Sequence, residues 1–151
     1  MSSLNNENQD LKYVIFKLEE EYYGIDINNV MSIEKAQDFT RVPNSPNYIK
    51  GVINLRGEVI PVIDLRNRFR LNEKEIDTNS RIIIVFVSEI QVGLLVDSSS
   101  EVMTFTEDEI DSAPSIKENI SENFIKSIGK KDNKLIVLLN LENVVGIDVS
   151  E

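Results

Sequence analysis

The sequence contains neither cysteine nor histidine among its 151 residues. Without cysteine there is no disulfide and no thiolate nucleophile, and without histidine the commonest general base and metal ligand are missing. The usual pairs of a nucleophile with a histidine base are therefore excluded. A serine–lysine or carboxylate pair remains formally open, but no motif in the chain supports one. We accordingly expect a protein that is not an enzyme and holds no metal or other cofactor.

Long apolar runs and positive charge are also scarce. No run reaches the roughly 18 residues that a membrane-spanning helix needs. Lys and Arg number 16 against 26 Asp and Glu, a net charge of −10 that would repel nucleic acid and anionic membrane surfaces. Residues 1–10 are polar and lack a signal-peptide pattern, so they predict a disordered tail. We expect a cytoplasmic protein that is monomeric when isolated and does not insert into the membrane.

Residues 11–151 predict many short strands and little helix, which is typical of an all-β fold. The predicted strands cover residues 12–19, 22–26, 52–55, 59–63, 81–87, 91–97, 101–105, 124–130 and 134–139. Helical turns are predicted after Asn28 through Val30 and Ile33, over residues 45–49, after the capping residue Asp64, after Thr106, and over residues 141–145. Gly57 supplies the positive φ of a tight hairpin turn between residues 55 and 59.

Three of the strands, at residues 59–63, 81–87 and 135–139, are apolar on both faces. A strand with one face in water would alternate apolar and polar residues. One small barrel cannot hide this much apolar surface, whereas two barrels packed together can. We expect the hairpin of residues 52–63 to be covered on both sides. Pro61 donates no ladder bond, so its strand should lie at a sheet edge or carry a bulge.

The run IKGVINLRGEVIPVIDLR at residues 49–66 resembles the signature of the CheW-type coupling proteins of bacterial chemotaxis. The resemblance extends to Tyr13-Val14-Ile15-Phe16, to residues 23–27 and 92–97, and to Ala113-Pro114, and so covers roughly residues 13–145. It implies two stacked five-stranded SH3-like barrels about a shared core. It also implies that residues 11–151 form one CheW-like domain of two intertwined β-barrel subdomains.

The same resemblance implies a non-enzymatic adaptor that couples transmembrane chemoreceptors, the methyl-accepting chemotaxis proteins, to the histidine kinase CheA. The helical hairpin tip of the receptor would lie in an apolar groove between the barrels, and the CheW-like regulatory domain of CheA would pack barrel against barrel. The adaptor would be recruited to receptor arrays at the inner face of the membrane. Receptor-binding residues implied by the resemblance are Ile27, Val30, Ile33, Asn54, Arg56, Gly57 and Ile82. Kinase-binding residues implied in the same way are Phe39, Val42 and Ile116.

Arg56 has two interpretations. It is either an exposed turn residue or a partly buried arginine that pairs with a carboxylate near residues 30–34. The family often has Glu where this chain has Ser32, so Glu34 or Glu58 would have to replace that partner. Val30 and Ile33, at helical spacing, fit core packing as well as a groove.

Two other functions remain open. One is a CheW-like scaffold in a non-chemotactic chemosensory pathway, such as pilus motility. The other is a small-ligand-binding or hydrolytic β-barrel protein.

Overall fold

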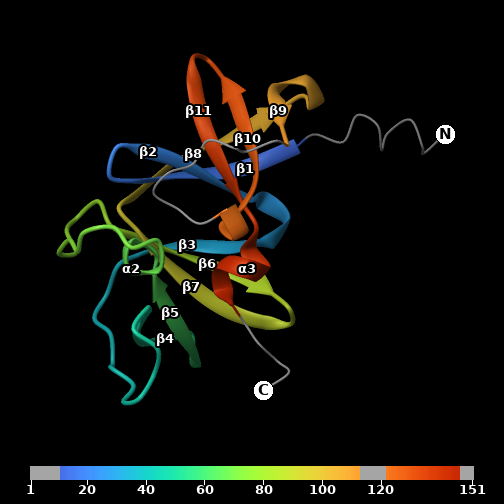
Figure 1. Ribbon diagram of the computed structural model, residues 1–151. Helices are drawn as coiled ribbons and strands as arrows, with labels where there is room; N and C mark the ends of the chain where they lie inside the picture. Colours follow the sequence, from blue (N-terminus) through green and yellow to red (C-terminus); the bar gives the residue numbers. More distant parts are fainter. Residues whose placement is uncertain (1–10, 113–121, 147–151) are drawn as a thin grey trace.

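The computed structural model describes residues 11–112 and 122–146, which form two sheets with a few short helical elements (Figure 1). The first sheet has the order β8-β1-β2-β11-β10-β9, and the second has the order β3-β6-β7-β5-β4. The first comprises β1 Leu11–Leu18, β2 Glu21–Asp26, β8 Ser98–Phe105, β9 Ile110–Asp111, β10 Ile125–Lys131 and β11 Lys134–Leu139. The second comprises β3 Val30–Lys35, β4 Ile49–Leu55, β5 Glu58–Asp64, β6 Arg81–Val87 and β7 Ile90–Val96. The expected all-β class is confirmed, with the two-residue β9 as an additional strand.

The first two and the last four strands of the described chain belong to the first sheet, and the second sheet is built from the strands between them. The strands β10 and β11 return to pair beside β2, where β11 runs parallel to β2. In the described residues, four short helical elements lie between strands and a fifth follows β11. They are η1 Ile27–Asn29, α2 Leu65–Arg68, η2 Glu107–Glu109, η3 Glu122–Phe124 and α3 Leu141–Val145. The two sheets stack one above the other, with α2 and α3 beside their junction (Figure 1).

Each sheet curls back on itself. In the second sheet, β3 and β4 are the outer strands, yet the chain that leaves β3 returns to β4 at Thr40. Thr40 and Val52 exchange two backbone hydrogen bonds of 3.0 and 2.8 Å. In the first sheet, the outer strands β8 and β9 are separated in sequence only by Thr106 and η2. The connections therefore link the outer strands of each sheet as in a small barrel, although no ladder joins those strands among the described residues, so each barrel is incompletely closed.

Three apolar clusters explain why several strands are apolar on both faces. One fills the first barrel with Tyr13, Ile15, Met103, Phe105, Ile136 and Leu138. Another fills the second barrel with Ile53, Ile60, Val62, Ile82, Ile84 and Leu95. The largest lies between the barrels and takes residues from both sheets, among them Phe16, Tyr23, Ile63, Phe69, Ile83 and Leu94. Successive residues of β6 thus alternate between the interior of a barrel and the shared core, because side chains in a strand alternate in direction.

Several local predictions are confirmed. The Asp64 carboxylate accepts a hydrogen bond from the Arg66 amide and caps α2. Thr106 forms the capping box that opens η2. Pro61 lies in an inner strand rather than an edge strand, but β5 pairs with β7 only from Val62 onward. On the other side, Val52 of β4 lies opposite Pro61 but forms its backbone hydrogen bonds with Thr40. Neither neighbouring strand therefore requires a backbone N–H group from Pro61.

Two predicted helical turns are wrong. Residues 30–35 form the strand β3, because the Asp26 carboxylate caps a 3-10 turn that ends before Val30, and β-branched Val30 and Ile33 then suit pairing with β6. Residues 45–48 form no helix, and only residues 47 and 48 are a turn, because the Ser45 hydroxyl donates to the Val42 carbonyl and so caps no helix. Ile49 already belongs to β4, where it pairs with Ile63.

Candidate partner-binding surfaces

The outer strand β3 presents apolar side chains to solvent. It pairs only with β6, so its other edge has no strand beside it among the described residues. Met31 is 55% exposed and Ile33 is 44% exposed, whereas Val30 is half-buried against the shared core. Val30 and Ile33 lie on a strand and not on one face of a helix, as had been predicted. Val30 therefore contributes to the shared core, whereas Ile33 is exposed to solvent. Two large apolar residues on an open edge are suited to contact a partner.

The hairpin of β4 and β5 holds Arg56 at its tip. Arg56 and Gly57 have φ of 52° and 85°, the positive values that a two-residue hairpin turn requires. The Asn54 side chain accepts a 3.1 Å hydrogen bond from the Gly57 amide and fixes this turn. Among the described residues, no atom beyond the chain neighbours lies within 4 Å of the place that a Cβ of Gly57 would take.

The carboxylate that meets Arg56 is that of Glu34 on β3, with 3.5 Å between Nη2 and Oε2. Glu58, the alternative, instead accepts a 2.6 Å hydrogen bond from the Gln91 side chain. The Arg56 side chain is 71% exposed and that of Glu34 is 21% exposed. The pair is therefore a weak surface contact, and most of the guanidinium is free to meet a partner.

The hairpin is not covered on both sides as its sequence predicted. Ile53 and Ile60 fill the second barrel, but the outward-facing Val59 is 67% exposed. Its neighbours Val52 and Pro61 are only half-buried. The uncovered face extends the apolar surface that this part of the molecule offers.

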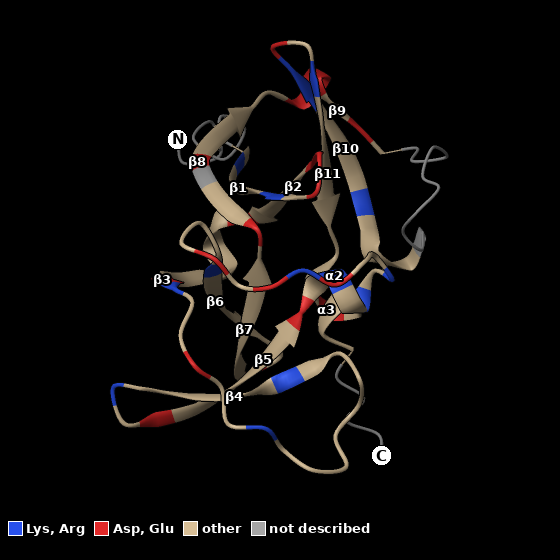
Figure 2. Ribbon diagram, turned by 90° about the vertical axis from the view of Figure 1, so that its left-hand side faces the viewer, with Lys and Arg blue, Asp and Glu red and all other residues tan. Residues whose placement is uncertain are grey.

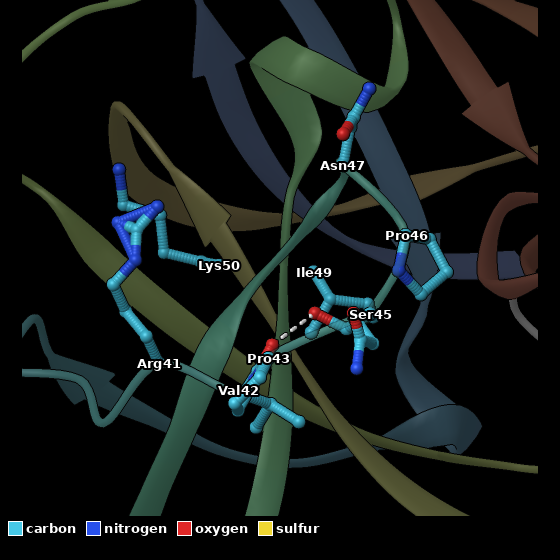
Figure 3. Close-up of a pocket in the computed structure, with 9 residues that line it drawn as sticks. Arg41, Val42, Pro43, Ser45, Pro46, Asn47, Ile49 and Lys50 are labelled. Atoms are coloured by element: carbon cyan, nitrogen blue, oxygen red, sulfur yellow. Dashed lines mark hydrogen bonds between the residues drawn. The ribbon is translucent and has the colours of Figure 1, made fainter.

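The connection between β3 and β4 contains the expected kinase-binding residues Phe39 and Val42. Phe39 is half-buried against the core of the second barrel, whereas Val42 is 40% exposed. Val42 lines a surface pocket of about 360 Å³ formed by residues 41–47, 49 and 50 (Figure 3). Ile116, the third expected kinase contact, lies outside the described residues, as do Ala113-Pro114 and the predicted tail of residues 1–10.

Three of the expected receptor-binding residues contribute to packing, and one of them is Val30, which packs against the shared core. Ile82 is fully buried inside the second barrel, so its side chain has no access to a partner, and we leave it out of the proposed surface. Ile27 is half-buried in η1 against the shared core. The residues that remain accessible around β3 and the hairpin tip are Ile33, Asn54, Arg56 and Gly57.

An ion-pair network that the sequence analysis missed connects the two barrels. Arg66, the second residue of α2, donates two hydrogen bonds to the Asp97 carboxylate, of 2.8 and 2.7 Å. Asp97 also accepts from the Glu19 amide, in the turn between β1 and β2, at 2.8 Å. Burial raises the pKa of Asp97, but the bonds from Arg66 and from the Glu19 amide outweigh it and hold that pKa below the usual value. Only the three-dimensional fold reveals the pairing, since 31 residues separate Arg66 from Asp97.

The part of the chain that the structure describes contains neither a metal-binding cluster nor a helix that could span a membrane. No group of three or more acidic side chains there is placed to hold a metal ion. Of the helices in these residues, none has the length and apolar character needed to cross a bilayer.

Comparison with known proteins gives a consistent result. The family described as the CheW-like domain matches residues 12–148. The chain is 42% identical over 140 residues to the chemotaxis protein CheW of Bacillus subtilis, covering 93% of this chain and 90% of that protein. It is 33% identical to the CheW of Helicobacter pylori, over 97% of this chain and 88% of the relative. The crystal structure of the scaffolding protein TtCheW from Thermoanaerobacter tengcongensis superposes with a TM-score of 0.86 at 38% identity, covering 93% of this chain and 95% of that one.

Proposed function

Since the chain belongs to the family of CheW-like domains, we propose that it is a non-enzymatic chemotaxis adaptor that couples chemoreceptors to the histidine kinase CheA. The family match over residues 12–148 carries this proposal. The relatives in B. subtilis and H. pylori are named chemotaxis proteins, and the solved relative is named a scaffolding protein. The adaptor acts in the cytoplasm as a monomer until it joins a receptor array.

The receptor surface comprises the outer strand β3 and the tip of the β4–β5 hairpin. Its apolar part is Ile33 together with the neighbouring Met31, both exposed on an open edge. Its polar part is Arg56, held at a rigid turn by the Asn54–Gly57 hydrogen bond. An amphipathic helix of a receptor hairpin would bury its apolar face against Met31 and Ile33, while a carboxylate on that helix would meet Arg56. This arrangement fits a receptor tip better than a small ligand, because the features lie on the surface rather than in an enclosed cavity.

The kinase surface comprises the β3–β4 connection at Val42, and Ile116 as a second contact. The receptor and kinase surfaces share β3 and β4 as their supports, so a displacement of these strands at one surface would reach the other. The adaptor would thus transmit a coupling free energy between its two partners without any chemical step.

The experiment that tests the proposed function is co-sedimentation of CheA with receptor-containing membranes. We expect CheA to sediment only when the adaptor is present. Failure of the wild-type adaptor to recruit CheA would contradict the proposal, and ligand-induced stabilisation by a small metabolite would favour the ligand-binding alternative.

A further inference from the structure

The pocket in the β3–β4 connection is basic in a strongly acidic protein. Among the nine residues that line it, Arg41 and Lys50 are cationic and none is acidic. The whole chain, in contrast, has 26 acidic residues against 16 basic ones. Figure 2 shows basic positions on β4 and on the connection beside it. A local reversal of the net charge of this kind attracts an anionic group.

The connection that forms the pocket is held in place by several contacts. The Thr40–Val52 hydrogen bonds pin its first part to β4. Gly51 permits this approach, since a Cβ at that position would lie 2.6 Å from the Thr40 carbonyl oxygen. Beyond Thr40, the Ser45 hydroxyl donates to the Val42 carbonyl, and the Ile49 amide donates to the Pro46 carbonyl. The pocket is therefore largely formed before a ligand arrives, which lowers the entropic cost of binding.

The two cations line the pocket from its two ends: Arg41 lies in the connection, and Lys50 lies on β4. In the view of Figure 3 both side chains extend in the same direction. None of the described carboxylates forms an ion pair with Arg41. Lys50 lies 4.0 Å from Asp64, at the limit of an ion pair, and its side chain is 40% exposed. Asp64 is also engaged in capping α2, so it neutralises Lys50 only partly.

We propose that this pocket binds a carboxylate side chain of a protein partner, namely an acidic residue on the CheW-like domain of CheA. The inference rests on the proposed function and specifies the chemistry of its kinase surface. Arg41 offers a planar fork that matches a carboxylate, and Lys50 adds a second cation. Exposed Val42 borders the pocket and adds apolar contact area around the ion pair. A free multivalent anion is a poorer occupant, because it would gain nothing from the apolar contact that Val42 offers a protein surface.

The test compares two double variants that lose the same charges. Arg41→Gln with Lys50→Gln removes the cations of the pocket. Arg70→Gln with Lys126→Gln removes one exposed arginine and one exposed lysine elsewhere. The probe is the purified CheW-like domain of CheA, and its Kd is measured by calorimetry at low and high salt. All four positions are exposed, so both variants should keep the melting temperature of the wild type.

We expect the pocket variant to bind about tenfold more weakly than the wild type at low salt, a loss typical of an interfacial charge pair. Its affinity should also depend less on salt, whereas the control variant should stay within about twofold of the wild type. Equal affinities of the two variants would overturn the pocket assignment while leaving the adaptor function standing. If inorganic phosphate raises the melting temperature of the wild type but not that of the pocket variant, the occupant is a small anion. That result would also overturn the assignment of the pocket to a carboxylate of the kinase. If the wild type does not bind the kinase domain at all, both proposals fail.

Discussion

At the scale of single residues, the charged groups fall into two classes that the sequence does not distinguish. Arg56 and Arg66 lie ten positions apart in the same motif. The Arg56 side chain is 71% exposed, whereas that of Arg66 is 12% exposed and bonds two oxygens of Asp97. Arg66 therefore contributes to the stability of the fold, and Arg56 is available to a partner. Motif position alone gives no account of this division, because it depends on which strands meet around each side chain.

Arg56→Lys should separate binding from stability. Because the contact with Glu34 is exposed, we expect the free energy of unfolding to change by less than about 0.5 kcal/mol. Lysine keeps the charge but loses the planar fork, so receptor affinity should fall by roughly five- to thirtyfold, or about 1–2 kcal/mol. Calorimetric titration of a receptor fragment measures this loss. Equal affinities would make Arg56 a simple turn residue.

Asp97→Asn should lower the free energy of unfolding by about 1–3 kcal/mol at neutral pH, because charged hydrogen bonds to Arg66 are lost. The pKa of Asp97 is lower in the folded state than in the unfolded state, where it is near 3.8. The ionised Asp97 carboxylate therefore contributes its full share of the free energy of unfolding above that pKa, and this share is lost as the pH falls through the lower pKa of the folded state. The difference between the variant and the wild type should shrink in urea titrations carried out below about pH 4.

Asp77→Asn provides a control for Asp97. The hydrogen bond from Lys74, with help from the Asn79 amide, lowers the pKa of Asp77 to about 2. Its side chain is exposed in a surface loop, so solvent screens the interaction and the stability change should be much smaller. A larger effect at Asp77 than at Asp97 would contradict the role assigned to the inter-barrel network.

At the scale of elements, β3 shows the limits of periodicity. Its sequence VMSIEK contains apolar residues three apart, which predicted a helical turn, yet it pairs with β6 from Val30 to Lys35, with a register shift at Met31. A single chain segment cannot show that a partner strand exists. The bounds of β6 were predicted correctly from its long apolar run. The cap of α2 at Asp64 was predicted as well, because both features depend on local chemistry. The Glu34 partner of Arg56 also required the structure, since it depends on β3 and β4 approaching each other.

Two substitutions on β3 should have opposite consequences. Ile33→Asp places a charge on an exposed position, so the fold should remain while receptor affinity falls at least about tenfold. Val30→Asp places the same charge against the shared core and should cost about 3 kcal/mol or more of stability. Melting curves and receptor titrations of both variants test these opposite expectations. If Ile33→Asp melts early and Val30→Asp does not, the orientation assigned to β3 is wrong.

At the scale of the whole molecule, the shared core joins the barrels into one unit. Phe16 stacks on Tyr23 with ring centroids 5.5 Å apart, Tyr23 contacts Phe69 at 5.7 Å, and Phe69 contacts Phe124 at 5.2 Å. Two of these rings lie on β1 and β2 of the first sheet, and the other two lie at the end of α2 and in η3, so they join the first sheet to the helical elements. The need for such a core was predictable from strands that are apolar on both faces. The specific ring contacts were not, because they involve residues far apart in sequence.

Phe69→Ala should therefore destabilise both barrels together. We expect a loss of about 3–5 kcal/mol, because Phe69 is only 2% exposed and its removal leaves a cavity. Hydrogen exchange should show amides of β1 and β6 losing protection by the same free energy. Val59→Ala, at a position 67% exposed, is the matched control and should leave both strands unchanged. Loss of protection in only one sheet would mean that the barrels unfold separately.

The most direct test of the adaptor function is a three-component sedimentation measurement. Receptor-containing membranes, CheA and the adaptor are mixed, and the CheA that sediments with the membranes is measured. The wild type should bring CheA into the membrane fraction, whereas Ile33→Asp should abolish recruitment through the receptor surface. The double variant Arg41→Gln, Lys50→Gln should still sediment itself but carry less CheA. If CheA sediments equally with and without the adaptor, or if both variants behave as the wild type does, the chain does not couple the two partners through these surfaces.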